Sequence, residues 1–235
     1  MWRLRVPAVG TEPASWRDWL SVEERERIGR KRHALDRQRD LTSRAGLRFL
    51  LAGYLGCDPG GIDLTTEANG KPVLTPSPGG PRLEFNASHA GEWVLLAFAH
   101  RRVGIDVEAW REIDHDEIVR HYFAPAEQAA WEGVPAAERL PAFFAAWTRK
   151  EAYVKALGTG LNLPLDRFAV RFHPADVPAE LVSCEEGGDA RSWLLADCSP
   201  APRYSGAVAV EAPAARIIGC EFSAGGGTPP GVHQL

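Results

Sequence analysis

Two short stretches carry the side chains with the clearest chemical potential: VGIDVE and, about forty residues later, WTRKEAYVK. The first reads as a strand, and an extended strand projects the carboxylates of Asp106 and Glu108 from one face. The second reads as a helix, where Glu151 and Lys155 are four residues apart and share a face. If strand and helix meet, three carboxylates and a lysine converge. Hard oxygen ligands beside a cation suit a divalent metal that holds a phosphate-bearing substrate.

Each part of this constellation also has an ordinary explanation. Acidic residues near a strand end are often solvated, although a charge that follows an apolar run, as Asp106 does, is costly unless it is paired or metal-bound. A glutamate with a lysine four residues on, as in Glu151 and Lys155, is the usual surface salt bridge of a helix. Trp147 lies on the same stripe as Glu151. We therefore expect this carboxylate at the edge of the core.

Hydrophobic periodicity predicts the elements that must position these groups. Strands are predicted over residues 2–9, 62–66, 71–74, 83–86, 93–99, 102–107, 168–172, 193–197 and 205–210. Helices are predicted over residues 22–55, in two pieces, and over residues 113–122, 125–131 and 141–157. Ser21 and Glu24 fit a capping box, and Gly158 is a natural helix end. The core positions expected in the first helical region are Ile28, Leu35, Leu41, Leu47, Leu50 and Leu51.

The order of these elements predicts an α+β protein of two similar halves that meet near residues 100–110. We expect an N-terminal half at residues 1–104 with a basic helix, and a C-terminal half at residues 105–222 with the metal and catalytic residues. Residues 223–235, rich in Gly and Pro, are expected to form a disordered tail. Both strand carboxylates then lie near the junction, which is a common place for a ligand cleft.

The composition is that of an ordinary globular protein, with 235 residues, 45% of them hydrophobic and 25% charged. No apolar run approaches the roughly 18–20 residues that a membrane-spanning helix needs. The N-terminus lacks the apolar stretch of a signal peptide. No CxxC pair occurs, which disfavours a zinc site and predicts reduced thiols in a cytoplasmic protein. The cysteines are Cys57, Cys184, Cys198 and Cys220.

Charge is distributed unevenly. The net charge of −4 gives no global field that would favour nucleic acid. From Arg17 to Arg48, ten Arg or Lys stand against six Asp or Glu, which leaves a local net charge of +4. Arginine forks bind phosphate oxygens well, and Arg37, Arg44 and Arg48 could share one helix face. We interpret these arginines as lying partly on a solvent-exposed helix face and partly in a binding site.

Two further segments could supply phosphate ligands. Ser88 and His89 follow a predicted strand and precede Gly91, and a Ser-His-Gly turn offers hydroxyl, imidazole and backbone donors together. A lone histidine is more often structural, so both interpretations stand. NGKP reads as a hairpin turn that also presents Lys71 at a fixed position. Other signatures are missing from the sequence: it has no GxSxG elbow, no phosphate-binding P-loop, and no GxGxxG after a strand.

Taken in order, NGKP, FNASHAG, VGIDVE and WTRKEAYVK resemble the Sfp-type 4′-phosphopantetheinyl transferases. The signature of that family reads roughly (V/I)G(I/V)D, a spacer of about forty residues, and (F/W)(S/C/T)xKE(A/S)xxK. Every position is met here, and 41 positions separate Asp106 from Trp147. Collinear motifs extend over about residues 21–172, whereas the N-terminal strand and the C-terminal tail carry no diagnostic residues.

The resemblance implies a monomer of two α+β halves related by a pseudo-twofold axis, with coenzyme A bound in the cleft between them. It also implies an enzyme that moves the phosphopantetheine arm of coenzyme A to a serine hydroxyl of an acyl or peptidyl carrier protein and releases adenosine 3′,5′-bisphosphate. The two-half form favours secondary metabolism, with polyketide or nonribosomal peptide carriers. Fatty acid synthase carriers stay possible, and neither nucleic acid nor a membrane is an expected partner.

By matching motif positions, Asp106, Glu108 and Glu151 resemble the Mg²⁺ ligands of the family, with Mn²⁺ as an alternative ion. Glu151 resembles the general base, and Lys155 the lysine that holds the coenzyme A phosphate. Glu127 occupies a place where the family often has an acid, and a supporting role is expected. The remaining coenzyme A ligands implied are Arg37, Arg39, Arg44, Lys71, Pro72, Ser88 and His89, with the register of the arginines left open.

Two rival functions remain. One is a degenerate family member that binds coenzyme A or a carrier protein without catalysis, although the intact carboxylate set speaks against it. The other is a Mg²⁺-dependent nucleotide-binding regulatory module.

Overall fold

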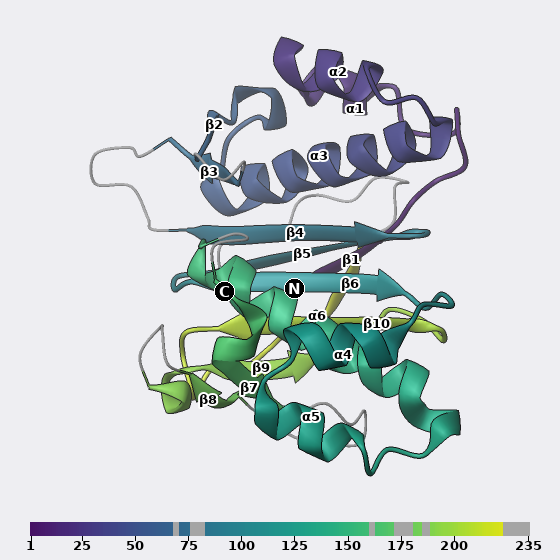
Figure 1. Ribbon diagram of the computed structural model, residues 1–235. Helices are drawn as coiled ribbons and strands as arrows, with labels where there is room; N and C mark the ends of the chain where they lie inside the picture. Colours follow the sequence, from purple (N-terminus) through teal and green to yellow (C-terminus); the bar gives the residue numbers. More distant parts are fainter. Residues whose placement is uncertain (68–70, 76–82, 160–162, 172–180, 185–188, 223–235) are drawn as a thin grey trace.

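The computed structural model describes residues 1–67, 71–75, 83–159, 163–171, 181–184 and 189–222, and Figure 1 shows the arrangement of the elements. The first half contains β1 (Trp2–Arg5), α1 (Ser15–Trp19), α2 (Val22–Gly29), α3 (Ala34–Leu55), β2 (Leu64–Thr66), β3 (Pro72–Leu74), β4 (Glu84–Ala90) and β5 (Trp93–Ala99). The second contains β6 (Val103–Ala109), α4 (His115–Tyr122), α5 (Pro125–Trp131), α6 (Arg139–Leu157), β7 (Phe168–Val170), β8 (Leu181–Cys184), β9 (Leu194–Asp197), β10 (Tyr204–Val210) and β11 (Cys220–Phe222).

Two sheets form the centre of the molecule. One has the strand order β11-β1-β5-β4 and the other β6-β10-β9, and β11 joins the first sheet by pairing parallel to β1. Figure 1 shows α3 along the sheet that contains β4 and β5, and α6 beside β6 and β10. The sheets adjoin at β4 and β6, where the backbone N–H of Ile105 donates to Asn86 Oδ1 at 2.9 Å. The predicted α+β class with two α/β halves is confirmed.

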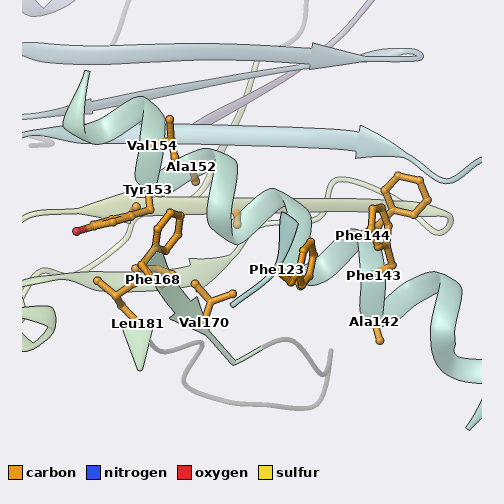
Figure 2. Packing of buried hydrophobic residues seen from close by; sticks show 14 of the residues in the cluster. Phe123, Ala142, Phe143, Phe144, Ala152, Tyr153, Val154, Phe168, Val170 and Leu181 are labelled. Carbon is orange, nitrogen blue, oxygen red and sulfur yellow. The ribbon is translucent and has the colours of Figure 1, made fainter. Parts of the chain in front are cut away.

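Each half has its own hydrophobic core. Leu47, Leu50 and Leu51 of α3 pack against the first sheet, and burying each such side chain contributes about 1.5–3 kcal/mol. The second core is rich in aromatic residues. Figure 2 shows Tyr153 of α6 beside Phe168, and the two ring centroids are 4.9 Å apart. These cores hold α3 and α6 firmly on their sheets, so the polar residues on the opposite side of each helix have fixed positions.

Gly104 brings α6 unusually close to β6. A Cβ atom at this position would lie 2.0 Å from the carbonyl oxygen of Ala152 and 2.4 Å from the backbone nitrogen of Ala156. Backbone atoms cannot swing away as a side chain can, so only glycine allows this approach. The contact lies two residues before Asp106, and it therefore sets the distance between the carboxylate of β6 and the polar face of α6.

The Gly104→Ala substitution should destabilise the protein by about 2–3 kcal/mol, because the new methyl group forces strand and helix apart. Urea unfolding followed by circular dichroism measures the loss. Gly29→Ala is the matched control, since a Cβ there meets nothing within 4 Å. Equal stability of the two variants would show that β6 and α6 are not in backbone contact.

Most predicted elements are confirmed within one to four residues at their ends, including the two helices in residues 22–55, the capping box of Ser21 and Glu24, and the left-handed Gly158 that ends α6. α1, β8 and β11, which are three to five residues long, were not predicted. No helix among the described residues is long and apolar enough to cross a membrane.

Two predictions are wrong. Leu35 is 59% exposed, because it lies in the first turn of α3 among neighbours that are themselves exposed. Ser88 and His89 do not form a turn after a strand but lie inside β4, where they pair with Leu95 and Val94 of β5. The turn begins only at Gly91, which has a φ of 54°.

Other predictions are not tested. The division at residue 104 stays a prediction. The predicted NG turn, the end of the 168–172 strand, and the tail at 223–235 lie outside the described residues.

Candidate active site

Asp106 is the centre of the candidate site. It lies in the middle of β6, opposite Ala207 of β10, and only 4% of its surface is exposed. Its Oδ1 accepts hydrogen bonds from Lys155 Nζ at 2.5 Å and from Ser88 Oγ at 2.8 Å. Lys155 Nζ also donates to Ser88 Oγ at 3.2 Å. Residues from β4, β6 and α6 thus meet at one carboxylate.

Glu151 lies one helical turn before Lys155 and belongs to the same electrostatic group. Burial raises the pKa of its carboxyl, and the negative charges of Asp106 and Glu108 raise it further, against the opposing effect of Lys155. A carboxylate with a raised pKa holds a proton more strongly and is a better base near neutral pH. Glu108 is partly exposed, and its Oε2 accepts a hydrogen bond from Arg111 Nη1 at 2.8 Å.

The donor set fits a divalent cation in its chemistry. Asp106 Oδ2 is buried and has no hydrogen-bond partner among the described residues, which is costly for a carboxylate oxygen unless a cation approaches it. Three carboxylates influence one another here, and oxygen ligands are those that Mg²⁺ prefers. Within the described ranges, however, no three His, Cys, Asp or Glu side chains are already gathered closely enough to hold a metal ion. Glu108 is turned to Arg111 instead.

A cavity of about 970 Å³ opens beside this group and is lined by both halves. Its charged side chains come mainly from α2, α3 and α6 and from the loops beside them. Among the described residues, five are lysine or arginine and three are aspartate or glutamate, so positive charges exceed negative ones by two. The basic residues are Arg27, Lys31, Arg44, Lys71 and Lys155, and the acidic ones are Asp40, Glu151 and Asp166. An excess of cations around a cavity favours an anionic ligand.

The cavity also has apolar walls on both sides. Phe85 and Leu47 line it from the first half, and Trp147 and Val154 line it from α6. Trp147, Glu151 and Lys155 all face the cavity, so the predicted shared stripe of α6 is confirmed. The space therefore offers charged groups for phosphates and apolar surface for an organic chain.

The predicted coenzyme A ligands fall into two groups. Arg44, Lys71, Pro72 and His89 line the cavity, and Ser88 contacts Asp106 and Lys155 beside it. The other two predicted arginines, Arg37 and Arg39, are not among the residues that line the cavity. Their side chains bind backbone carbonyls of neighbouring connections.

Arg37 and Arg39 support segments that carry cavity residues. Arg37 Nη1 donates to the carbonyl oxygens of Lys31 at 2.8 Å and of Arg32 at 3.0 Å. Arg39 Nε donates to the carbonyl oxygen of Gly91 at 2.7 Å, two residues after His89. Each arginine therefore holds a connection that carries or adjoins a cavity residue, Lys31 in one case and His89 in the other.

Arg44 is a cavity residue with a constrained charge. Burial lowers the pKa of its guanidinium, as does the nearby charge of Arg27, whereas Glu24 and Asp40 raise it. Arg48, one turn further along α3, is buried and donates to Glu24 Oε2 at 2.8 Å and to the carbonyl of Ile62 at 2.8 Å. Arg48 thus stabilises the fold, and Arg44 is the arginine of α3 that lines the cavity.

Several cavity residues were missed by sequence reasoning. They come from α2, the connection that follows it, α3 and the end of α4, and from a loop after α6. The local net charge of +4 was the only sequence signal for the basic residues among them. It indicates the region but does not show which side chains face the cavity. These residues are Arg27, Lys31, Asp40, His121, Tyr122 and Asp166.

Lys150 and Glu127 form a buried ion pair rather than a binding surface. Their exposures are 0% and 2%, and Lys150 Nζ donates to Glu127 Oε2 at 2.5 Å and to the carbonyl of Phe168 at 2.7 Å. Glu127 also accepts from the backbone nitrogens of Ala124 and Val170. The pair thus ties α5, α6 and β7 together and fixes the helix that carries Glu151 and Lys155.

Comparison with known proteins covers both halves of the chain. The model of the 4′-phosphopantetheinyl transferase superfamily matches residues 102–209, and that of the 4′-phosphopantetheinyl transferase N-terminal region matches residues 12–101. The 4′-phosphopantetheinyl transferase Sfp of Bacillus subtilis strain 168 is 33% identical over 167 residues, which are 71% of this chain and 73% of Sfp. The 4′-phosphopantetheinyl transferase HetI of a Nostoc species is 32% identical over 212 residues, which are 89% of this chain and 86% of HetI.

Among solved structures, the holo-(acyl-carrier-protein) synthase of Thermotoga maritima is 21% identical with a TM-score of 0.36. The match covers 47% of this chain and 62% of that one.

Proposed function

The chain belongs to the Sfp-type 4′-phosphopantetheinyl transferase family, and we propose that it transfers phosphopantetheine to carrier proteins from coenzyme A bound in the cavity between its two halves. One observation carries the assignment of the site. The buried carboxylate of Asp106 is bonded to Lys155 beside a cavity rich in cations and lined by both halves. Transfer of a phosphoryl group depends mainly on positioning and charge stabilisation, and this arrangement can supply both.

Coenzyme A would be held by two sets of side chains. Lys155 and Ser88 would bind its diphosphate, since they gather at Asp106. Arg44, Lys71 and His89 would bind the 3′-phosphate, and the missed cations Arg27 and Lys31 join them in the cavity lining. The apolar walls offer a surface for the pantetheine arm. Binding at both ends would fix the reacting phosphorus in place.

Members of this family use coenzyme A together with Mg²⁺, and Asp106, Glu108 and Glu151 would hold the metal in this chain. When bound, Mg²⁺ or Mn²⁺ neutralises charge on the oxygens of the diphosphate. Asp106 Oδ2, which has no hydrogen-bond partner in the described part of the chain, supports this assignment. Glu108 would have to leave Arg111 to take part.

The transfer itself exchanges one phosphorus–oxygen bond for another. The serine oxygen of the carrier attacks the phosphorus that bears pantetheine, and Glu151 accepts the hydroxyl proton directly or through a water. The bond between this phosphorus and the bridging oxygen of the diphosphate breaks, and adenosine 3′,5′-bisphosphate leaves with the electron pair. Lys155 stabilises the charge that develops on the leaving phosphate.

The family also suggests the cellular setting. We propose an enzyme that acts as a monomer in the cytoplasm and serves carrier domains of polyketide or nonribosomal peptide synthesis, as the similarity to Sfp-type relatives favours. The free thiols of Cys57, Cys198 and Cys220 agree with a reducing compartment. Exposed arginines of the first half could steer an acidic carrier domain toward the cavity.

Release of adenosine 3′,5′-bisphosphate tests this function. The protein, coenzyme A and MgCl₂ should produce it, by chromatography, only when an apo carrier domain is added. A carrier with alanine in place of its modified serine is the control, and it should give none. If no carrier domain in a panel supports release of adenosine 3′,5′-bisphosphate although coenzyme A still binds, the protein is a binding module without catalytic activity. If ATP stabilises the protein against heat more than coenzyme A does, it is a nucleotide-binding regulator.

A further inference from the structure

Asp40 places a carboxylate inside a cavity whose other features attract anions. It lies on α3, and its side chain is 15% exposed. Asp40 Oδ1 is 3.3 Å from His89 Nε2, and Asp40 Oδ2 is 3.5 Å from Lys31 Nζ. All three residues line the cavity. A negative charge there repels phosphates by itself, so its presence needs a physical reason.

The reason lies in how its two partners are attached. Lys31 belongs to the connection between α2 and α3, and its ammonium ends a flexible chain that is about half exposed. His89 projects from β4 and is also partly exposed. Asp40 is the more buried member, and it rises from a helix packed on its sheet. It can therefore hold both side chains in place before a ligand arrives, which lowers the entropy lost on binding.

The contact also fixes the orientation of the His89 ring. Nε2 lies 3.3 Å from Asp40 Oδ1, so its proton is donated to the carboxylate and the ring is held in one position beside the cavity. Burial alone would raise the pKa of Asp40, but the hydrogen bond from His89 and the charge of Lys31 lower it overall, so Asp40 stays ionised near neutral pH.

We propose that Asp40 is a positioning residue for phosphate recognition, which holds the side chains of His89 and Lys31 so that both face the anionic end of coenzyme A. This inference rests on the proposed function of the cavity. It assigns Asp40 no contact with the reacting atoms. Its effect reaches the ligand through His89 and Lys31.

The direction in which one substitution changes coenzyme A binding tests the proposal. Asp40→Asn keeps the shape but removes the charge, and it should raise both the dissociation constant and the KM for coenzyme A about tenfold. The kcat at saturating coenzyme A should change by less than about twofold, because no group in contact with the reacting atoms is altered. If Asp40 only repelled phosphates, the same substitution would lower both constants.

Asp166→Asn is the matched control. Asp166 is a second aspartate of the cavity lining, and its removal should relieve repulsion and lower the dissociation constant about two- to threefold. Titration calorimetry with coenzyme A alone gives this constant without a carrier protein. Opposite signs for the two aspartates support positioning, and a lowered constant in both variants overturns it.

A double-mutant cycle separates positioning from a general loss of structure. In a His89→Ala background, Asp40→Asn should lose most of its effect on coenzyme A binding, since one of its two partners is gone. An unchanged tenfold effect in that background would contradict the role assigned to His89. Failure of the proposed function is distinct, because then the unaltered protein transfers nothing, whereas the binding constants can still be compared.

Discussion

Replacing Glu151 by glutamine will reduce phosphopantetheine transfer about a thousandfold. Glutamine keeps the size of the side chain but can neither accept the serine proton nor carry the charge that a metal requires. Burial and two neighbouring carboxylates raise the pKa of Glu151, so the natural residue is well suited as a base. The rate of carrier modification at saturating coenzyme A measures the loss. Circular dichroism and the melting temperature should stay close to those of the unaltered protein.

Two further variants are compared with Glu151→Gln, one in the same site and one as a control. Asp106→Asn should cause a loss of similar size, because it leaves Lys155 without its ion-pair partner and removes the carboxylate at the centre of the site. Glu132→Gln is the control, since Glu132 is an exposed carboxylate at the end of α5. Near-normal turnover of Glu151→Gln would show that Glu151 is neither the general base nor a required metal ligand.

Replacing Lys150 by methionine will lower the free energy of unfolding by about 3–5 kcal/mol, because it leaves the charge of Glu127 buried without its partner. The ammonium of Lys150 also lies 4.4 Å from the ring centroid of Phe168, an interaction that is lost as well. Adding Glu127→Gln should restore part of the stability, so the double variant loses less than the sum of the single variants. Chemical denaturation of the four proteins in the cycle gives these values.

An exposed ion pair supplies the control for this cycle. Arg30 and Glu26 are four residues apart at the surface of α2 with 4.0 Å between their charged atoms, and Arg30→Met should change stability by less than about 0.5 kcal/mol. A cost below about 1 kcal/mol for Lys150→Met would mean that Lys150 and Glu127 are not a structural pair.

Local patterns predicted the central part of the site. The four-residue spacing in α6 and the two-residue spacing in β6 follow from helix and strand geometry, so Glu151, Lys155 and Asp106 could be assigned to faces. The close approach at Gly104 was not predicted, although a glycine inside an apolar strand often marks one. The spacing of residues could not show which element each face of the helix or strand contacts. The bond between Lys155 and Asp106 joins residues 49 positions apart.

The rest of the site depends on long-range packing. Ser88 and His89 were predicted in a turn, but pairing with β5 extends β4 over them, and no local pattern in FNASHAG shows this. The pairing of β1 with β11 joins the two ends of the described chain. Asp40 was one acid among many charges of a basic segment, and only the fold brings it to His89. Arg37 and Arg39 share a sequence signal with Arg44 but bind carbonyl groups instead.

The central claim is that this chain attaches phosphopantetheine to carrier proteins at a site built around Asp106 and Glu151. The most direct measurement is the intact mass of an apo carrier domain after incubation with the protein, coenzyme A and MgCl₂. The account predicts that the carrier gains the mass of one phosphopantetheine arm on its serine, and that Glu151→Gln leaves the carrier unmodified over the same time. An unmodified carrier in a panel that a known phosphopantetheinyl transferase converts fully would contradict the activity. Full conversion by Glu151→Gln would contradict the site.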